Sequence, residues 1–313
     1  MTARAHLHFI QTEATDAFDA AVVRAGIGAP TPFADAIDRL DQFHDDTLLR
    51  CPSDACPRHV LTDFTTARLS SDDPIALASV VTTLDTESTW HALTGRSPGT
   101  ASAVTVAAQI EHATTVVLTE WRALDTESVT LLVALLGHLN PSASLVLLGS
   151  DSSIGVDDGR HRDIASAVMA NAGWMHVLSG TFTPRTVHDR VATFRYENVR
   201  PFHPGRLAEL FSDDSDGGGR IVRSAGFFTI SSRPDEVALW DQCGTAMTFS
   251  LLRHDHSDGE PLTIGQDIAF TGVDLDVARL TTELDACVLD DDELLAGAES
   301  WTRWPDPLPR WDE

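Results

Sequence analysis

Residues 116–124 read VVLTEWRAL, and this stretch decides the fold class of the first half of the chain. Its apolar run stops abruptly at Thr119, Glu120 and Arg122. A short apolar run bounded by polar residues is typical of a strand that is buried on both faces of a parallel sheet. Parallel sheets bind ligands at the carboxyl ends of their strands, so these three residues are candidate ligand-binding positions.

Strand and helix patterns alternate through the first half of the chain. Apolar runs predict strands at 6–12, 58–64, 76–86, 116–118 and 144–150. Apolar residues at helical spacing predict helices at 16–26, 33–43, 104–113 and 127–143. This alternation predicts an α/β domain over residues 1–150, in which helices cover a parallel sheet.

The second half of the chain has a different pattern. A polar loop and a helix at 164–174 fall in the segment 151–190, which we expect to lie between two domains. A strand, a turn and a helix come next, and several successive strands precede a last helix with Asp274 near its start. This order predicts an α+β domain at 191–290.

The tail at 291–313 is rich in tryptophan and proline. It holds three of the seven tryptophans, among three prolines. Because large aromatic side chains are rarely left in water together, we expect the tail to pack back onto the protein. Docking to a partner is the alternative.

The charge of the chain limits its partners. The net charge is −25, and all 22 basic residues are arginines. This excess of acids opposes binding to DNA or RNA phosphates, and suits either a basic protein partner or solubility alone. No apolar run approaches the roughly 18 residues that span a bilayer, and the N-terminal stretch lacks the apolar core of a signal peptide. We therefore expect a cytoplasmic protein without a membrane segment.

Cys51, Cys56 and His59 are the first candidate metal ligands. Two thiolates and an imidazole suit zinc, but the four-residue gap between the cysteines is at the outer end of common spacings. We favour a fortuitous pair of loop cysteines over a metal site. Cys243 and Cys287 stand alone in apolar patterns and are expected in the core.

His254 and His256, in RHDHSDGE, are the second candidate metal ligands. If this segment is extended, the two imidazoles share one face. The composition is equally typical of a solvated hairpin tip, so both interpretations stay open for a weak, exposed site.

The second half of the chain resembles the C-terminal domain of the CobW-like GTPase family, which contains metal chaperones and zinc-homeostasis proteins. The resemblance runs from about Val191 to Trp311. It rests on FRYENVRPFHPGRLAEL, RSAGFFTISSRPDEVALWDQCG, IGQDIAFTGVDLDVARLTTELDACVL and the closing WPDPLPRW. The matching positions that we single out are Arg200, His203, Gly226, Trp240 and Gly244.

The first half resembles the family's GTPase domain more weakly, which implies a P-loop-NTPase-like sheet in degenerate form. The family's Asn-Lys-x-Asp motif would fall on Thr119, Glu120, Trp121 and Arg122, where a guanidinium that only donates replaces a carboxylate that only accepts. The P-loop lysine cannot be present, because the chain contains no lysine. Asp63 is a weak candidate for the family's conserved glutamate.

The resemblance implies two alternative functions. The first is an adaptor that has lost GTP binding and hydrolysis and acts through its C-terminal domain in zinc homeostasis. Some actinobacterial members of the family recruit a hibernation factor to ribosomes, which implies a basic, ribosome-associated partner. The second is a GTP-dependent zinc or cobalt metallochaperone with divergent motifs. The sequence assigns no cofactor and no catalytic residue, leaves zinc open, and disfavours GTP with Mg²⁺.

Overall fold

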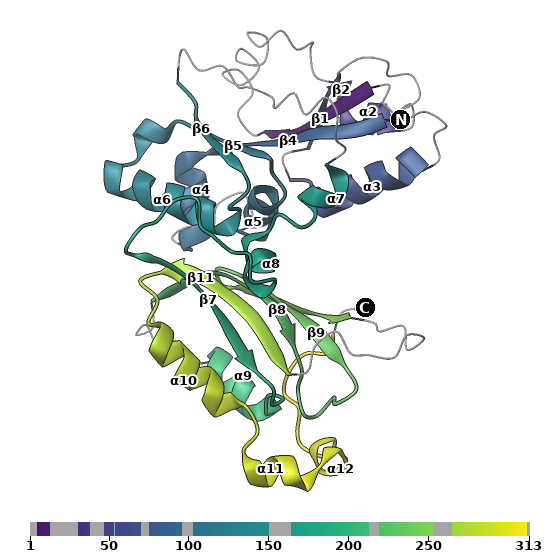
Figure 1. The fold of residues 1–313 in the computed structure, drawn as a ribbon, viewed down its shortest axis with the longest axis vertical. Helices are drawn as coiled ribbons and strands as arrows, with labels where there is room; N and C mark the ends of the chain where they lie inside the picture. The colour runs from purple at the N-terminus through teal and green to yellow at the C-terminus, as the bar shows by residue number, and fades with distance from the viewer. Residues whose placement is uncertain are drawn as a thin grey trace. The chain divides into compact units, whose positions relative to one another are not determined.

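The computed structural model describes residues 5–12, 31–37, 47–52, 54–69, 75–95, 103–149, 164–212, 219–252 and 265–311 (Figure 1). The chain divides into two compact units. The first comprises Met1–Gly173 and Thr183–Val187, and the second comprises Trp174–Phe182 and His188–Glu313. The boundary between the units falls inside the segment 151–190, which was expected to lie between two domains. Trp174–Phe182 belongs to the second unit, and Thr183–Val187 belongs to the first.

The first unit is built on a six-stranded parallel sheet. Its strands are β1 (Ala5–Thr12), β2 (Thr31–Pro32), β3 (Thr47–Cys51), β4 (Ile75–Asp85), β5 (Thr115–Thr119) and β6 (Ser144–Leu147). The strand order is β2-β3-β1-β4-β5-β6, and every neighbouring pair is parallel. Strand β4 is buried along nearly its whole length because its sequence, IALASVVTTLD, carries no charge before the final Asp85. The predicted α/β class is confirmed.

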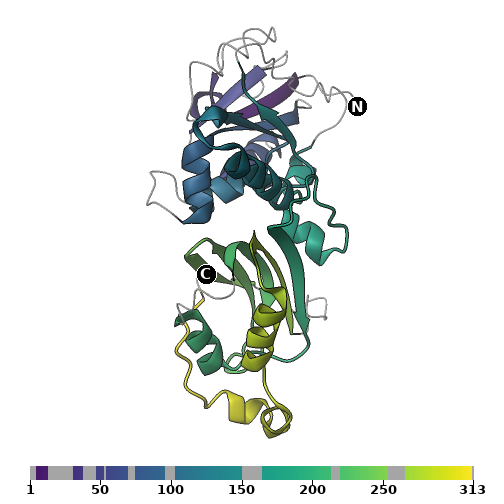
Figure 2. The same ribbon diagram turned by 90° about the vertical axis from the view of Figure 1, so that its left-hand side faces the viewer.

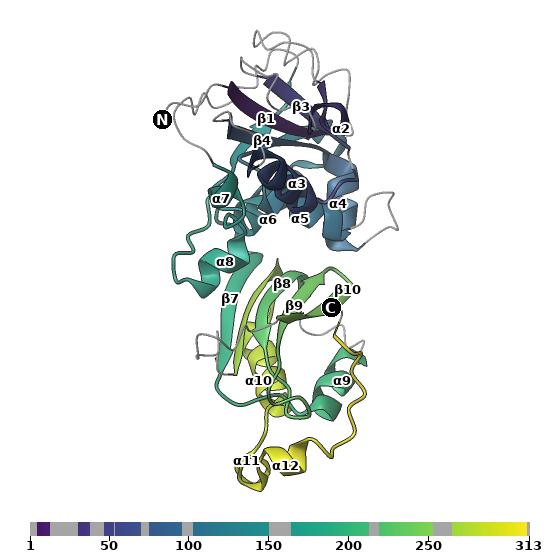
Figure 3. The ribbon, with the colours of Figure 1, turned by 90° about the vertical axis from the view of Figure 1, so that its right-hand side faces the viewer.

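Five helices connect these strands within the described residues. They are α2 (Phe33–Ala36), α3 (Pro57–Leu69), α4 (Thr86–Thr94), α5 (Ala103–Glu111) and α6 (Thr126–Leu139), and α7 (Ala165–Val168) follows the last strand. Asp85 and Asp125 begin α4 and α6 by accepting hydrogen bonds from the backbone N–H groups of Ser88 and Ser128. Figure 3 shows α3, α4, α5 and α6 below the sheet of the first unit.

Three predictions for the first unit are wrong. Residues 58–64 belong to helix α3, whose buried Val60, Leu61 and Phe64 follow helical spacing that a seven-residue window concealed. The strand of this region is instead β3. Strand β6 forms the sheet edge and is half-exposed, not buried. The helix expected at 164–174 is confined to the short α7, with α8 beginning only at Gly173.

Two helix predictions are tested little or not at all. The helix expected at 16–26 lies outside the described residues. Within the helix expected at 33–43, only α2 and the next residue, Ile37, are described.

The second unit contains a five-stranded antiparallel sheet. Its strands are β7 (Val191–Asn198), β8 (Arg220–Phe228), β9 (Val237–Cys243), β10 (Ala246–Leu252) and β11 (Gln266–Val273). The order is β10-β9-β8-β11-β7. Its helices are α8 (Gly173–Leu178), α9 (Pro204–Ser212), α10 (Val277–Cys287), α11 (Asp291–Ala296) and α12 (Ala298–Trp301). The predicted α+β architecture is confirmed.

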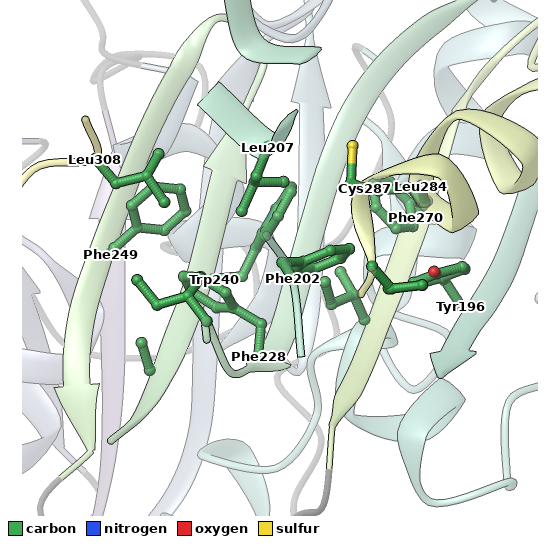
Figure 4. Packing of buried hydrophobic residues seen from close by; sticks show 14 residues of the cluster. Tyr196, Phe202, Leu207, Phe228, Trp240, Phe249, Phe270, Leu284, Cys287 and Leu308 are labelled. Atoms are coloured by element: carbon green, nitrogen blue, oxygen red, sulfur yellow. The ribbon is translucent and has the colours of Figure 1, made fainter. Parts of the chain in front are cut away.

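Helices α9 and α10 pack side by side on one face of this sheet (Figure 2). Leu207 of α9 and Leu284 of α10 are buried in one cluster with sheet residues such as Phe228, Trp240 and Phe270 (Figure 4). Cys287 joins this cluster, and Cys243 is also buried, as expected.

The tail packs back onto the second unit, as predicted. The indole of Trp311 meets Phe228 and Phe249 edge-on at centroid distances of 5.3 and 5.8 Å. The guanidinium of Arg233 covers the Trp311 ring at 4.1 Å. Leu308 is buried in the same cluster.

Helix α10 begins three residues after Asp274, so Asp274 lies near its start as expected. Asp276 is the N-cap, and it accepts a hydrogen bond from the Arg279 N–H. Asp274 has a left-handed backbone with φ of 53° and forms an ion pair with Arg190 at 2.7 Å. Among the described residues, no helix has the length and apolar character to cross a membrane.

Candidate functional site

The carboxyl ends of β4 and β5 adjoin in the sheet, with Asp85 opposite Thr119. Thr119 is buried, and its hydroxyl donates to the carbonyl of Leu84 at 3.3 Å. The hydroxyl of Thr86 donates to the Thr119 carbonyl at 2.5 Å. Asp85 caps α4 through Ser88 at 2.8 Å, which is the capping role that its position suggests. These polar groups therefore hold β4, α4 and β5 together.

The residues after Thr119 turn outward. Glu120 is exposed and has a left-handed backbone with φ of 49°, which is uncommon for a residue with a side chain. It leads into a single 3-10 turn, Trp121–Ala123. The guanidinium of Arg122 lies 4.3 Å from the centroid of the neighbouring Trp121 ring. This exposed guanidinium can only donate hydrogen bonds.

Asp63 lies away from the strand ends. It is an exposed residue within α3, six residues after the helix begins at Pro57, and not at the end of a strand. The structure therefore does not bring Asp63 together with Thr119, Glu120 and Arg122 as one strand-end group.

The first candidate metal ligands, Cys51, Cys56 and His59, differ in how deeply they are buried. Cys51 is 2% exposed and packs among the apolar residues around Phe9 and Phe64. Burial raises the pKa of this thiol to about 12, which disfavours the thiolate form that binds metal. Cys56 is half-buried, and His59 is exposed in the first turn of α3. No group of three metal-ligating side chains occurs among the described residues, and His254 and His256 lie outside them.

His203 begins helix α9, and its role is structural. Its Nδ1 accepts hydrogen bonds from the backbone N–H groups of Gly205 and Arg206, at 3.1 and 3.3 Å. Its ring stacks on Trp304 of the tail. Partial burial and the nearby Arg206 lower the pKa of His203, which keeps the imidazole in the neutral form that can accept these bonds.

Gly226, Trp240 and Gly244 shape the antiparallel sheet. A Cβ atom on Gly226, where φ is 155°, would lie 2.1 Å from the carbonyl oxygen of Asp267 on the neighbouring strand. The indole of Trp240 is buried and donates to the Ser224 hydroxyl at 2.8 Å. Gly244 takes the positive φ of 56° in the tight turn between β9 and β10. All three positions therefore contribute to the pairing and packing of the antiparallel sheet.

Arg200 and Arg206 line a hollow of about 490 Å³ in the second unit. The other lining residues are Asn198, Asp285, Ala286, Val288, Leu289 and Asp290. Arg206 forms a two-point ion pair with Glu293 at 2.8 and 2.7 Å, which lowers the pKa of Glu293 to about 2. Of the residues that line the hollow, the sequence patterns singled out Arg200 but not the acidic residues. The acid-rich run after Leu284 could have pointed to these acidic residues.

Residues 191–288 match the family model described as the cobalamin synthesis protein CobW C-terminal domain. The second unit therefore contains a CobW C-terminal domain. A curated relative, the zinc-regulated GTPase metalloprotein activator 1 of Dictyostelium discoideum, is 27% identical over 223 residues. The match covers 64% of this chain and 47% of the relative, so the chain spans about half the length of the curated relative it matches.

Two solved structures are also similar to this chain. They are the Zn(II)-bound YjiA GTPase from E. coli and a triple mutant of the same protein, each 12% identical to this chain. Both comparisons cover 92% of this chain and all of the other, with TM-scores of 0.36 and 0.37. Similarity this weak adds nothing to the assignment, which rests on the C-terminal domain and the curated relative.

Proposed function

We propose that this CobW-like protein acts in zinc homeostasis through protein contacts of its C-terminal domain, and that its first unit has lost GTP binding and hydrolysis. The observation that carries the proposal is the chemistry at the end of β5. Arg122 presents donors at the position where the family's motif presents a carboxylate, and the chain has no lysine for a P-loop.

The proposed partner is a basic, ribosome-associated protein, such as a hibernation factor recruited when zinc is short. The net charge of −25 supports a basic partner and opposes direct contact with nucleic acid. The packed core of the C-terminal domain, to which the tail contributes, supports contact through the surface of this domain. The proposed location is the cytoplasm.

The second candidate function is a GTP-dependent zinc or cobalt metallochaperone. It is favoured by the name of the curated relative, a zinc-regulated GTPase metalloprotein activator. This function requires a metal site and a nucleotide site built from residues other than those of the family's motif. Zinc is the metal that we would expect the protein to bind in this case.

The metal content of the purified protein separates the two candidates. We expect the protein to purify without stoichiometric zinc and together with a basic ribosome-associated partner. Stoichiometric zinc, measured by mass spectrometry and abolished by either Cys51→Ser or Cys56→Ser, would establish the metallochaperone instead. Cys243→Ser is the control, because Cys243 is buried in the second unit, in the antiparallel sheet.

A further inference from the structure

The hollow in the second unit is preformed because two arginines brace its walls. Arg200 donates to the carbonyl of Leu289 at 2.9 Å and pairs with Asp291. Arg206 donates to the carbonyl of Val288 at 2.8 Å and pairs with Glu293. Arg200, before α9, and Arg206, in the first turn of α9, are thus each linked to the turn between α10 and α11. The charge of each guanidinium is offset by a carboxylate.

Two carboxylates in the hollow keep an oxygen available. Asp285 accepts hydrogen bonds from the Tyr196 hydroxyl and the Asn198 amide through the same oxygen, Oδ1. Asp290 caps α11 through Oδ1, which accepts from the Glu293 N–H. Within the described part of the chain, Oδ2 of neither residue accepts a hydrogen bond. Both side chains belong to exposed residues, so a ligand can reach these oxygens from solvent.

The charge and the lining favour a basic side chain as the occupant. Between residues 280 and 302 the sequence holds seven acids, at 283, 285, 290, 291, 292, 293 and 299, and no base. Ala286, Val288 and Leu289 supply apolar lining beside the two carboxylates. An arginine or lysine has the matching chemistry, because its charged head seeks carboxylates while its methylene stem packs on apolar surface.

We propose that this hollow receives an arginine or lysine side chain of a basic partner protein, held by Asp285 and Asp290. The inference rests on the proposed function, since it names the surface through which the C-terminal domain engages that partner. Interface energy concentrates on a few anchor residues seated in pockets, and arginine is common among them.

Fluorescence anisotropy with a labelled peptide of alternating arginine and alanine tests this site on the full chain. The same peptide with citrulline in place of arginine is the control ligand, because it keeps the shape and removes the charge. The site variant is Asp285→Asn with Asp290→Asn. Asparagine keeps the acceptor for Tyr196 and Asn198 and is an equally good N-cap, so the fold is retained.

The matched control variant is Asp235→Asn with Asp276→Asn. It removes the same charge from exposed positions of the second unit, one of them also an N-cap, at the start of α10. We expect the site variant to weaken binding of the arginine peptide by about tenfold or more and the control variant by less than about twofold. The citrulline peptide should not bind.

Equal weakening in the two variants would overturn the proposal, because only long-range charge would then act. Unchanged binding in the site variant would overturn it as well. Failure of this inference can be distinguished from failure of the proposed function. If a natural partner binds normally to the site variant, the inference about the hollow is wrong and the adaptor function stands. If the protein binds GTP while the hollow binds the peptide, the loss of GTP binding is wrong and the hollow stands.

Discussion

The imidazole of His203 stacks on the indole of Trp304, with ring centroids 5.0 Å apart and planes 28° apart. One residue of the turn before α9 thereby anchors the tail while its Nδ1 caps the helix. This contact joins the RPFHP motif to Trp304 of the tail, although the two are more than 90 residues apart in the sequence.

Protonation of His203 should destabilise the second unit. The pKa of His203 is lowered in the folded protein, by burial first and by Arg206 second, so the unfolded chain binds the proton more tightly. The contribution of neutral His203 to the free energy of unfolding is complete above the ordinary histidine pKa. It is lost as the pH falls toward the lower pKa that His203 has in the folded protein. We expect the midpoint of tryptophan-monitored thermal unfolding to drop between about pH 7 and pH 5.

His203→Asn is the control for this prediction. Asparagine can cap the helix without titrating in this range, so the pH dependence should be shallower than in the wild-type protein. An equally steep dependence in the variant would assign the effect to other histidines.

Trp311→Ala should destabilise the second unit by about 2 kcal/mol, because it removes the contacts of a half-buried indole with Phe228, Phe249 and Arg233. The measurement is urea unfolding of the full chain. Arg310→Ala, at the exposed neighbouring position, should have almost no effect. A loss of the same size in both variants would show that the tail does not pack through Trp311.

Gly226→Ala should prevent stable folding of the antiparallel sheet. The new methyl group would lie 2.1 Å from the Asp267 carbonyl oxygen, on backbone that cannot move without breaking the β8–β11 pairing. Gly244→Asn is the contrast, because that position has open space and a left-handed φ that asparagine tolerates. Circular dichroism should show lost sheet signal in the first variant only.

Cys56 should be the cysteine of the native protein that reacts fastest with a thiol reagent. Cys51, Cys243 and Cys287 are buried, and burial raises the pKa of Cys51 to about 12 and of Cys287 to about 11. Labelling followed by peptide mass spectrometry checks this order. If Cys51 and Cys56 are equally protected until a chelator is added, they share a bound metal and the fortuitous-pair interpretation fails.

The buried strands and the C-terminal helices could be predicted because their sequences depart strongly from the average. Strand β4 has ten successive uncharged residues, and α10 has an N-cap, helical spacing and no glycine. Helix α3 was misread because its apolar residues are few and its exposed face carries β-branched threonines, which favour strands in a short window.

The candidate sites were harder to predict because they depend on distances between elements. Local spacing made Cys51, Cys56 and His59 a plausible ligand set, yet the strand buries the first thiol and the helix exposes the histidine. The hollow combines Arg200 and Arg206 with residues more than 70 positions later in the chain, which no local pattern could reveal.

Calorimetric titration of the purified protein with GTP and Mg²⁺, with ATP as the control nucleotide, tests the central claim most directly. The protein concentration should suffice to detect a dissociation constant of about 100 μM. We expect no binding heat for either nucleotide, because our proposal places Arg122 where the family's motif has its guanine-binding carboxylate, and because the chain has no lysine. Saturable binding that is selective for GTP would contradict the account and make the GTP-dependent metallochaperone the leading function.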